Sequence, residues 1–401
     1  MIPWLWRAVI DFWQAIGVIL LIVVIVEFGI EPVRRMGRWL RGRQSTGPSN
    51  QMASLDDLLG YHDDIGSQAL DWAPYTHWRQ RPYHGPYTTV DARGLRVTLG
   101  CDRDDAKAIR VYCFGGSTLF CLGARDAATI PSVLQRRLNE TGIRTAVTNH
   151  AQLGYNSSQD VLNLQALLKR GDVPDLAIFY NGFNDMFTAE WTGRADGIRG
   201  EETRRAEFLL LTRVRRFALL RAAVAAALPR TLRRLRDWTG FEWRTPLIRE
   251  RHRPLADSAV PTLAREVVAA YAANVRIARA LAREYGIQVL FVWEPSLATK
   301  RAKSDQERRM ESDGALSLEI RRRFYSAVIE EYRQWEGLTG AADILDLSAL
   351  FDKREDPVYI DFAHLTEAGN AAVAEAMLPA VAAIVTAIEK TLTARLMPPR
   401  R

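Results

Sequence analysis

The chain alternates between short apolar runs and longer amphipathic stretches over most of its length, after one long apolar stretch near the N-terminus. The short runs beyond residue 100 are rich in Val, Ile, Leu and aromatic residues, which is typical of buried strands. The predicted strands are Ala108–Phe114, Arg144–Thr148, Asp175–Tyr180, Ile287–Trp293 and Ala342–Leu347.

Amphipathic stretches with a repeat near 3.6 residues lie between these strands and predict helices. In one of them Ser157 and Asp160 have the spacing of a capping box. Strands that alternate with helices favour a mainly parallel sheet covered on both faces, whose active site lies beyond the carboxyl ends of the strands. The predicted helices cover residues 131–139, 157–170, 264–285, 316–335 and 368–396.

The long apolar stretch, Phe12–Ile30, is interrupted only by Gln14 and Glu27 and is long enough to cross a ~30 Å hydrocarbon layer as a helix. A cleaved signal peptide and a buried core helix are the alternatives, but the stretch is long for a signal peptide and no small-residue cleavage site closes it. We therefore expect residues 1–43 to form one transmembrane anchor with a basic flank. The arginines after Ile30 favour a cytoplasmic position for the domain on their C-terminal side.

Residues 44–54 are polar and contain a Gly-Pro pair, so they are predicted to be a linker. Residues 55–107 are aromatic and interrupted by prolines. We expect them to be an extension packed on the α/β domain that follows, with a β-hairpin around Thr88–Leu99.

The α/β domain is predicted to cover residues 108–401, with one insertion at about 186–253. Within the insertion, Arg204–Leu228 is rich in helix formers and carries an arginine every few residues. Such a basic amphipathic helix suits a membrane surface, a lid over an acyl pocket, or a solvated helix packed by one face.

The charge of the chain adds little to this picture. Lys and Arg number 54 against 47 Asp and Glu, a net charge of +7, but no nucleic-acid-binding motif accompanies the excess, so we expect no nucleic-acid partner. Three cysteines without CxxC spacing exclude a disulfide framework and a cysteine-rich zinc site, while leaving room for one bridge. His77 and His84 lack further metal ligands nearby, so no metal or cofactor is expected.

One strand runs directly into two glycines, a serine and a threonine, in the stretch VYCFGGSTLF from Val111 to Phe120. A phosphate-binding P-loop would need a lysine after the glycines, and a dinucleotide fingerprint would need GxGxxG. The nucleophile elbow GxSxG fails as well, because Leu119 stands where the last glycine belongs. What remains is either an ordinary turn or a nucleophilic Ser117 at the end of a strand.

A serine needs a base and an acid to act as a nucleophile, and the stretch YIDFAHLTEAGN near the C-terminus supplies both types. Asp361 and His364 are three residues apart, which allows a carboxylate to lie beside the imidazole. Alone, the pair could equally be a turn residue and a structural histidine. Together with Ser117 it has the composition of a catalytic triad.

Acyl transfer through serine also needs fixed hydrogen-bond donors for the developing oxyanion. The Gly154 N–H in NHAQLGYNSSQ and the Asn184 amide in YNGFND both follow predicted strands and can supply them. Asp185 and Asp356 are rival acids for the triad, but neither has the three-residue relation to His364. We expect Asp185 to cap a loop and Asp356 to belong to a turn.

In this order, the four stretches FGGST, AQLGYNSSQ, NGFND and DFAHLTEAGN resemble the nucleophile, glycine, GxND and DxxH blocks of the SGNH (GDSL-like) hydrolases. The resemblance covers roughly residues 109–396 outside the insertion. It implies a flavodoxin-like three-layer α/β/α sandwich with a mainly parallel five-stranded sheet.

By the same resemblance, Ser117 is the nucleophile, His364 the base and Asp361 the acid. The Ser117 N–H, the Gly154 N–H and the Asn184 side chain form the oxyanion hole. One departure from the family pattern is Gly116, which stands where many members carry an acidic residue before the serine.

The sequence therefore predicts a membrane-anchored serine esterase or acyltransferase acting on small acyl esters, such as O-acetyl groups on a glycan or a lipid-linked sugar. The alternative is an inactive, membrane-anchored binding component of an envelope polysaccharide or lipid assembly system. Anchored relatives usually work outside the cytoplasm, so we expect an extracytoplasmic domain although the basic flank argues for the opposite side.

Overall fold

The computed structural model describes residues 70–213, 255–312, 318–339 and 341–396. The predicted anchor and its basic flank (1–43) and the linker (44–54) lie outside these residues. The chain divides into two compact units, and the second consists of residues 53–199 and 252–401. The first is described only through residues 200–213, which hold helix α8 (Glu201–Arg213). All other described elements belong to the second unit.

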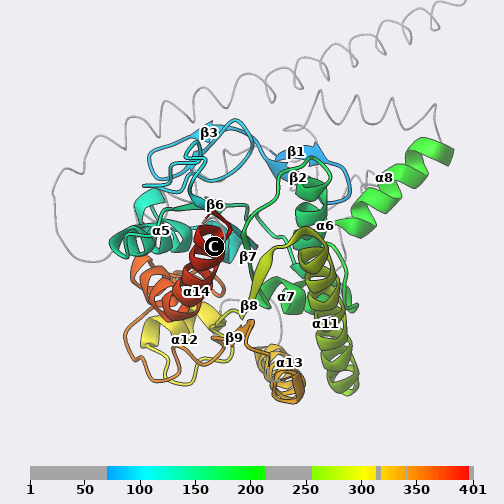
Figure 1. Ribbon diagram of the computed structural model, residues 1–401. Helices are drawn as coiled ribbons and strands as arrows, with labels where there is room; N and C mark the ends of the chain where they lie inside the picture. Colours follow the sequence, from blue (N-terminus) through cyan, green and yellow to red (C-terminus); the bar gives the residue numbers. More distant parts are fainter. Residues whose placement is uncertain (1–69, 214–254, 313–317, 340, 397–401) are drawn as a thin grey trace, which may run out of the picture. The chain divides into compact units, whose positions relative to one another are not determined.

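A five-stranded parallel sheet forms the centre of this unit, with the strand order β6-β5-β7-β8-β9 (Figure 1). In chain order this is 2-1-3-4-5, the order of flavodoxin-like folds, so the predicted fold class is confirmed. The predicted strand ends agree with the observed ones to within about two residues, the usual spread of strand assignments. The strands are β5 (Ile109–Gly115), β6 (Thr145–Asn149), β7 (Leu176–Asn181), β8 (Gln288–Trp293) and β9 (Ile344–Asp346).

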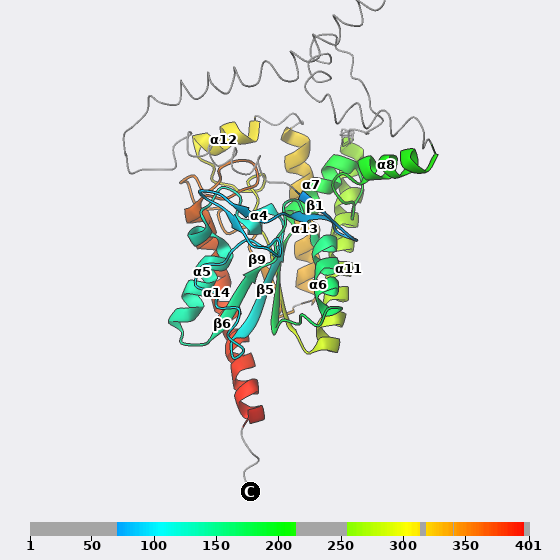
Figure 2. The same ribbon diagram turned by 90° about the horizontal axis from the view of Figure 1, so that it is seen from above.

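Helices cover both faces of the sheet, and Figure 2 shows the three layers. Alternate residues of β5 point to opposite faces: Val111 and Cys113 join one buried cluster, and Tyr112 and Phe114 join the other. The first face is covered by α5 (Ile130–Glu140) and α14 (Glu367–Leu396). The second is covered by α6 (Ser157–Leu168), α7 (Phe183–Thr192), α11 (Val260–Tyr285) and α13 (Leu318–Thr339).

The N-cap of helix α6 lies one residue earlier than predicted. Asn156 is the N-cap, its side chain accepts from the Gln159 N–H, and the Gln159 side chain accepts in return from the Asn156 N–H. The predicted capping box of Ser157 and Asp160 is therefore wrong. Asp160 instead lies buried and accepts a hydrogen bond from the Asn181 amide, 2.7 Å away.

The segment before the sheet contains two small antiparallel pairs, β1 (Leu70–Ala73) with β2 (His77–Gln80) and β3 (Tyr83–His84) with β4 (Thr89–Val90). The predicted hairpin around Thr88–Leu99 is present in a short form. Val90 and Arg96 form an antiparallel bridge, the Asp91 N–H donates to the Leu95 carbonyl at 2.8 Å, and the Val97 N–H donates to the Thr89 carbonyl at 3.0 Å. The β1-β2 pair was not predicted. The remaining elements are α4 (Ser117–Phe120), η2 (Asp126–Ala128), η3 (Asp257–Ala259) and α12 (Asp305–Ser312).

Within the described residues, one helical stretch, Glu367–Ala394 of α14, is long and apolar enough to cross a membrane by length and composition. Its residues Val373, Met377, Val381 and Val385 are completely buried in the cluster that α14 shares with α5 and β5. The apolar character of α14 up to Val385 is thus explained by its place as a layer of the fold.

The structure changes the predicted bounds of the insertion and excludes the one disulfide that the sequence left open. The first part of the predicted insertion at 186–253 belongs to the core, because Met186 and Ala189 of α7 are buried in the cluster on the second face of the sheet. The cysteines form no bridge: Cys101, Cys113 and Cys121 are all described, and none takes part in a disulfide.

Candidate active site

The candidate nucleophile Ser117 is the first residue of α4, immediately after β5 and Gly116. The two glycines allow the chain to turn in a crowded place. A Cβ at Gly115 would lie 2.7 Å from the Tyr180 carbonyl oxygen, and one at Gly116 would lie 2.0 Å from the amide nitrogen of Asn184. Neither position accepts a larger residue without displacing these neighbours.

The structure brings Ser117 together with the distant pair near the C-terminus. The Ser117 Oγ lies 2.9 Å from Nε2 of His364, and Nδ1 of His364 lies 2.6 Å from Oδ2 of Asp361. Serine, imidazole and carboxylate thus form one hydrogen-bonded series, the arrangement in which a histidine takes the proton of a serine hydroxyl.

A short closed loop holds Asp361 and His364. At its base the Thr366 N–H donates to the Val358 carbonyl at 2.8 Å, and nearer its tip the Ile360 N–H donates to the His364 carbonyl at 2.9 Å. Oδ1 of Asp361 accepts from the backbone N–H groups of Ala363 and His364, both at 2.7 Å. One carboxylate oxygen therefore fixes the loop, and the other is left for the imidazole.

Opposing effects set the pKa of Asp361. Burial by itself raises the pKa of this carboxyl, but the neighbouring His364 and the two N–H donors hold it below its ordinary value. The carboxylate is therefore ionised at neutral pH, as is required of a group that stabilises an imidazolium.

The two other predicted oxyanion donors lie on loops that follow β6 and β7. Asn184 is buried near the start of α7 and donates through Nδ2 to the Tyr155 carbonyl at 2.7 Å. Gly154 precedes Tyr155 and has a φ of +76°, a conformation that favours glycine. Because a Cβ at Gly116 would touch the Asn184 amide, that amide lies beside the turn that carries Ser117.

The rival acids lie elsewhere. Asp185 accepts hydrogen bonds from the Ser157 hydroxyl and the Gly182 N–H, and so joins the start of α6 to the start of α7. Burial raises its pKa to about 6. Asp356 forms an exposed ion pair with Arg354 at 2.6 Å. Neither contacts the His364 imidazole.

Sequence reasoning missed Glu294, which directly follows β8. It is buried, and one of its oxygens accepts the Phe183 N–H at 2.8 Å, while Oε2 has no hydrogen-bond partner among the described residues. Burial raises its pKa to about 8. The only sequence signal was an acid placed directly after a strand whose last five residues are apolar.

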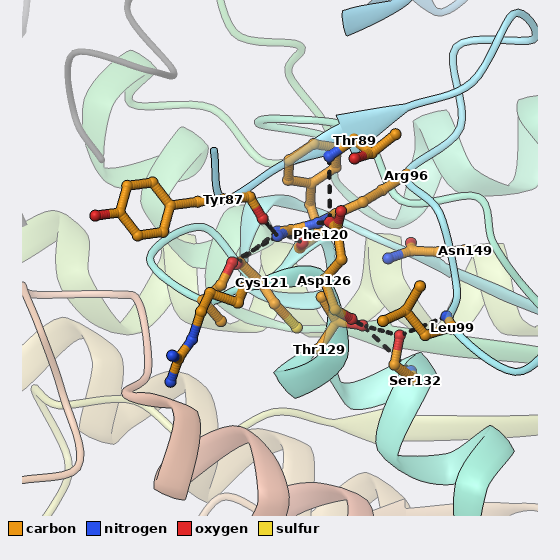
Figure 3. A network of polar contacts seen from close by, with 12 residues as sticks. Tyr87, Thr89, Arg96, Leu99, Phe120, Cys121, Asp126, Thr129, Ser132 and Asn149 are labelled. Carbon is orange, nitrogen blue, oxygen red and sulfur yellow. Dashed lines mark hydrogen bonds and ion pairs between the residues drawn. The ribbon is translucent and has the colours of Figure 1, made fainter. Parts of the chain in front are cut away.

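A second missed residue, Arg96, holds the turn that carries the nucleophile (Figure 3). Its side chain is fully buried and donates to the carbonyl oxygens of Phe120 at 2.6 Å, Cys121 at 2.8 Å and Ala124 at 2.5 Å. Its Nε also pairs with Asp126 at 3.1 Å. A guanidinium suits this place because its five N–H donors lie in one plane.

The extension also holds the glycine loop. The Gln152 side chain accepts from the Gln80 N–H at 2.7 Å and donates to the Gly94 carbonyl at 2.9 Å. The Trp78 indole donates to the Leu153 carbonyl at 2.8 Å. Residues before β5 thus contact both the serine turn and the loop that bears Gly154.

A buried ion pair supports the loop of Asp361 and His364 from below. Nζ of Lys300 lies 2.6 Å from Oε2 of Glu307, and both side chains are almost completely buried. Glu307 also accepts the Val358 N–H at 3.0 Å, and Lys300 donates to the Asp356 carbonyl at 3.3 Å. The pair thus binds the backbone at the base of the loop.

Aromatic side chains line one flank of the site. Phe362 lies in the loop between Asp361 and His364 and is 39 % exposed. Its ring centroid lies 5.9 Å from that of Phe183 and 5.8 Å from that of Phe187. Phe183 is buried, whereas Phe362 and Phe187 are partly exposed and offer an apolar surface at the loop that carries His364.

His77 and His84, the histidines of the extension that the structure describes, have other neighbours than the serine site. His77 stacks on Trp72 with a centroid distance of 5.7 Å, and Nδ1 of His84 lies 3.4 Å from the Thr89 hydroxyl. In the part of the chain that the structure describes, no group of His, Cys, Asp and Glu side chains is arranged to hold a metal ion.

No family model and no curated protein matches the chain. Similar solved structures include a carbohydrate acetylesterase family member from Sinorhizobium meliloti, 16 % identical with a TM-score of 0.36, which covers 69 % of this chain and 99 % of its own. The acetyl xylan esterase AlAXEase is 16 % identical with a TM-score of 0.38, over 68 % of this chain and 100 % of its own. A member of the lipolytic protein G-D-S-L family from Veillonella parvula is 12 % identical with a TM-score of 0.37, over 68 % and 97 %. These likenesses are too distant to reveal an activity, so the function is inferred from the geometry of the site.

Proposed function

We propose that the chain is a serine esterase of SGNH type that cleaves small acyl esters through an acyl-enzyme. The observation that carries the proposal is the series Ser117–His364–Asp361, with contacts of 2.9 and 2.6 Å between residues up to 247 positions apart. If Ser117 were only a turn residue and His364 only a structural histidine, these contacts would not be required. Nor would Asp361 need to fix the loop with Oδ1 while it holds the imidazole with Oδ2.

The reaction follows from the atoms in contact. Ser117 Oγ attacks the ester carbonyl carbon while Nε2 of His364 takes its proton, and Asp361 stabilises the resulting imidazolium. The negative charge on the carbonyl oxygen is met by the N–H groups of Ser117 and Gly154 and by the Asn184 amide. The imidazolium then protonates the departing alkoxide, and water or a sugar hydroxyl, activated by His364, releases the acyl group.

The flanking rings favour a compact, partly apolar substrate group beside His364. Phe362 and Phe187 present their rings next to the catalytic loop, a surface on which an acetyl methyl group or the apolar face of a sugar ring can pack. We propose O-acetyl groups on a glycan or a lipid-linked sugar as the substrate class. Transfer to a sugar hydroxyl in place of water belongs to the same proposal.

A fluorophosphonate probe tests the proposed chemistry, because such probes react with an activated serine. We expect labelling of the full-length chain in neutral detergent, loss of labelling in Ser117→Ala, and strongly reduced labelling in His364→Gln. Ser132→Ala is a matched control, since Ser132 is buried at the start of α5 and should leave labelling unchanged. Equal labelling of wild type and Ser117→Ala would sink the proposal and leave the alternative, a non-catalytic binding component.

We further propose that Phe12–Ile30 anchors the chain in a membrane with the catalytic domain on the extracytoplasmic side. The length of this apolar segment supports the anchor. The basic flank at Arg34–Arg43 argues against the extracytoplasmic side. Alkaline phosphatase fused after Arg43 should be active if the domain is extracytoplasmic. If β-galactosidase, which is active only in the cytoplasm, is active at the same position, the domain lies on the cytoplasmic side and the proposed orientation is wrong.

A further inference from the structure

A cleft of about 980 Å³ lies between the β1-β2 pair and α6, outside the serine site. The two elements are adjacent in Figure 1 and are joined by a hydrogen bond of 2.7 Å from the Gln159 side chain to the Thr76 carbonyl. This volume is at the upper end of the ~300–1,000 Å³ of small-molecule sites, so the cleft suits a ligand of several rings better than a single small ion.

Cationic side chains dominate the charge of this cleft. Arg79, Lys169 and Arg170 line it, all three are exposed, and none has a carboxylate within ion-pair distance among residues 70–213, 255–312, 318–339 and 341–396. Among the described residues that line the cleft, the only acid is Asp172, which is already engaged by Arg110. Exposed cations without acidic partners leave the cleft complementary to a ligand with several negative charges.

Aromatic rings stand at the same cleft. Trp72 is 66 % exposed and Tyr75 is 71 % exposed, although most large aromatic side chains of this fold are buried. His77 stacks against Trp72 and fixes the indole. Nζ of Lys169 lies 6.0 Å from the ring centroid of Tyr75, so a cation and a ring face share one part of the cleft.

One deeply buried group also borders the cleft without a partner. The His150 ring lies between Tyr112 and Phe114, with centroid distances of 4.3 and 5.3 Å. It is 3 % exposed, lines the cleft, and its Nε2 makes no hydrogen bond within the described residues. A buried ring nitrogen without a partner is costly, and a hydroxyl or other polar group of a ligand can satisfy it.

We propose that this cleft binds an acidic saccharide chain, whose sugar rings pack on Trp72 and Tyr75 and whose carboxylates pair with Arg79, Lys169 and Arg170. Exposed rings beside cationic side chains in a recessed cleft favour a saccharide over a lipid surface, since a bilayer needs an apolar face that projects outward. Arginine and lysine supply the charge-assisted hydrogen bonds that carboxylates accept.

The cleft shares one loop with the serine site. Gln152 and Tyr155 line the cleft, while the Tyr155 carbonyl accepts the hydrogen bond of Asn184 at the other side of the same loop. A saccharide held in the cleft would therefore lie against the loop that bears Gly154. Binding in the cleft does not require turnover at Ser117, so the two proposals can fail separately.

Isothermal titration of the full-length Ser117→Ala chain in neutral detergent tests the proposal, with a hexamer of galacturonate as the acidic probe and xylohexaose as the neutral one. We expect the acidic hexamer to bind at least ten-fold more tightly, with an affinity that falls as salt is raised. Equal affinity for the two hexamers, or no binding of either, would overturn the proposal.

Variants locate the binding. Trp72→Ala and the triple variant Arg79→Gln, Lys169→Gln, Arg170→Gln should each weaken binding of the acidic hexamer at least ten-fold. The control with the same loss of charge is Lys107→Gln, Arg136→Gln, Lys390→Gln, three exposed residues outside the cleft. An equal loss in this control, or binding to phosphatidylglycerol vesicles without binding to the hexamer, contradicts the saccharide site.

The proposed esterase chemistry has its own readout. If wild type fails to react with the fluorophosphonate probe but the hexamer binds as expected, the saccharide site stands and the esterase proposal fails. If the probe reacts and the hexamer does not bind, the reverse holds.

Discussion

Two buried cations support the two halves of the candidate triad in different ways. Arg96 donates to the backbone carbonyls of Phe120, Cys121 and Ala124 at the serine turn. Lys300 pairs with the carboxylate of Glu307 beneath the loop of Asp361 and His364. Most acceptors of Arg96 are backbone carbonyls, which no substitution removes, whereas the partner of Lys300 is a side chain. The serine turn therefore depends on the single residue Arg96. The loop of Asp361 and His364 depends on the pair of Lys300 and Glu307, in which both members can be replaced together.

The largest expected effect is the loss of Arg96. Arg96→Met removes the guanidinium from three buried carbonyls and from Asp126. Cys121 keeps the Ala124 N–H and Asp126 keeps the Thr89 N–H, but the Phe120 and Ala124 carbonyls lose their donor and Asp126 loses its cation. Each unsatisfied group costs about 1–3 kcal/mol. We expect the free energy of unfolding to fall by more than about 4 kcal/mol, measured by urea denaturation, together with loss of probe labelling at Ser117.

Because Arg96→Met can fail to fold, Arg96→Lys supplies the second measurement. Lysine keeps the charge but offers a compact ammonium in place of the planar fork, so we expect a folded chain with slower labelling. Labelling at the wild-type rate in Arg96→Lys would show that the guanidinium geometry does not position Ser117.

The next effect concerns the pair of Lys300 and Glu307. Lys300→Met leaves a buried carboxylate without its cation and should lower the free energy of unfolding by about 3 kcal/mol. The double variant Lys300→Met, Glu307→Gln should recover most of this loss, since the glutamine oxygen still accepts the Val358 N–H. A double variant as unstable as the sum of the single ones contradicts an exchangeable pair.

Glu294 sharpens the comparison, because it is a buried acid without a cation among the described residues. Its pKa of about 8, above the ordinary 4.5, means that it stays protonated in the folded chain where the unfolded chain is ionised. The free energy of unfolding should therefore fall as pH rises from about 5 to about 8.

Glu294→Gln removes that ionisation and should flatten this decline, giving a chain about 2–3 kcal/mol more stable than wild type at pH 8. Thermal denaturation at several pH values measures it, and Glu284→Gln on the exposed face of α11 is the control. An unchanged slope in Glu294→Gln would assign the pH dependence to other groups.

The smallest effect is expected for an exposed contact between the same two halves. Arg125 lies near the serine turn and pairs with Glu367 at the start of α14, but its side chain is 68 % exposed. Arg125→Gln should change the free energy of unfolding by less than about 0.5 kcal/mol, and less still at high salt. A loss comparable to that of Lys300→Met would mean that burial does not separate strong from weak supports.

The sheet was predictable because each strand is an apolar run between clear helix patterns. The apolar runs and their spacing along the sequence identified all five strands. Because β5, β6 and β7 are neighbours in a parallel sheet, the residues that follow them lie at the same edge of that sheet. The closeness of Ser117, Asp361 and His364 was anticipated from four ordered motifs, which no single motif would have allowed.

The supporting residues were not predictable, because their roles depend on contacts across long stretches of chain. Arg96 looks like any surface arginine in the sequence, and only the fold shows that it is buried against the serine turn. The α6 cap was misplaced by one residue, since Asn156 and Ser157 are both good N-cap residues. Lys300 and Glu307 carry no sequence signal of burial.

The close approach of Gly116 and Asn184 has a consequence for how such a chain is recognised from its sequence. A side chain at position 116 would begin 2.0 Å from the Asn184 amide nitrogen, so an acidic residue cannot enter there by a single substitution without moving Asn184. A search pattern that demands an acid before the serine would pass over this chain, although its Ser117, His364 and Asp361 form one hydrogen-bonded series.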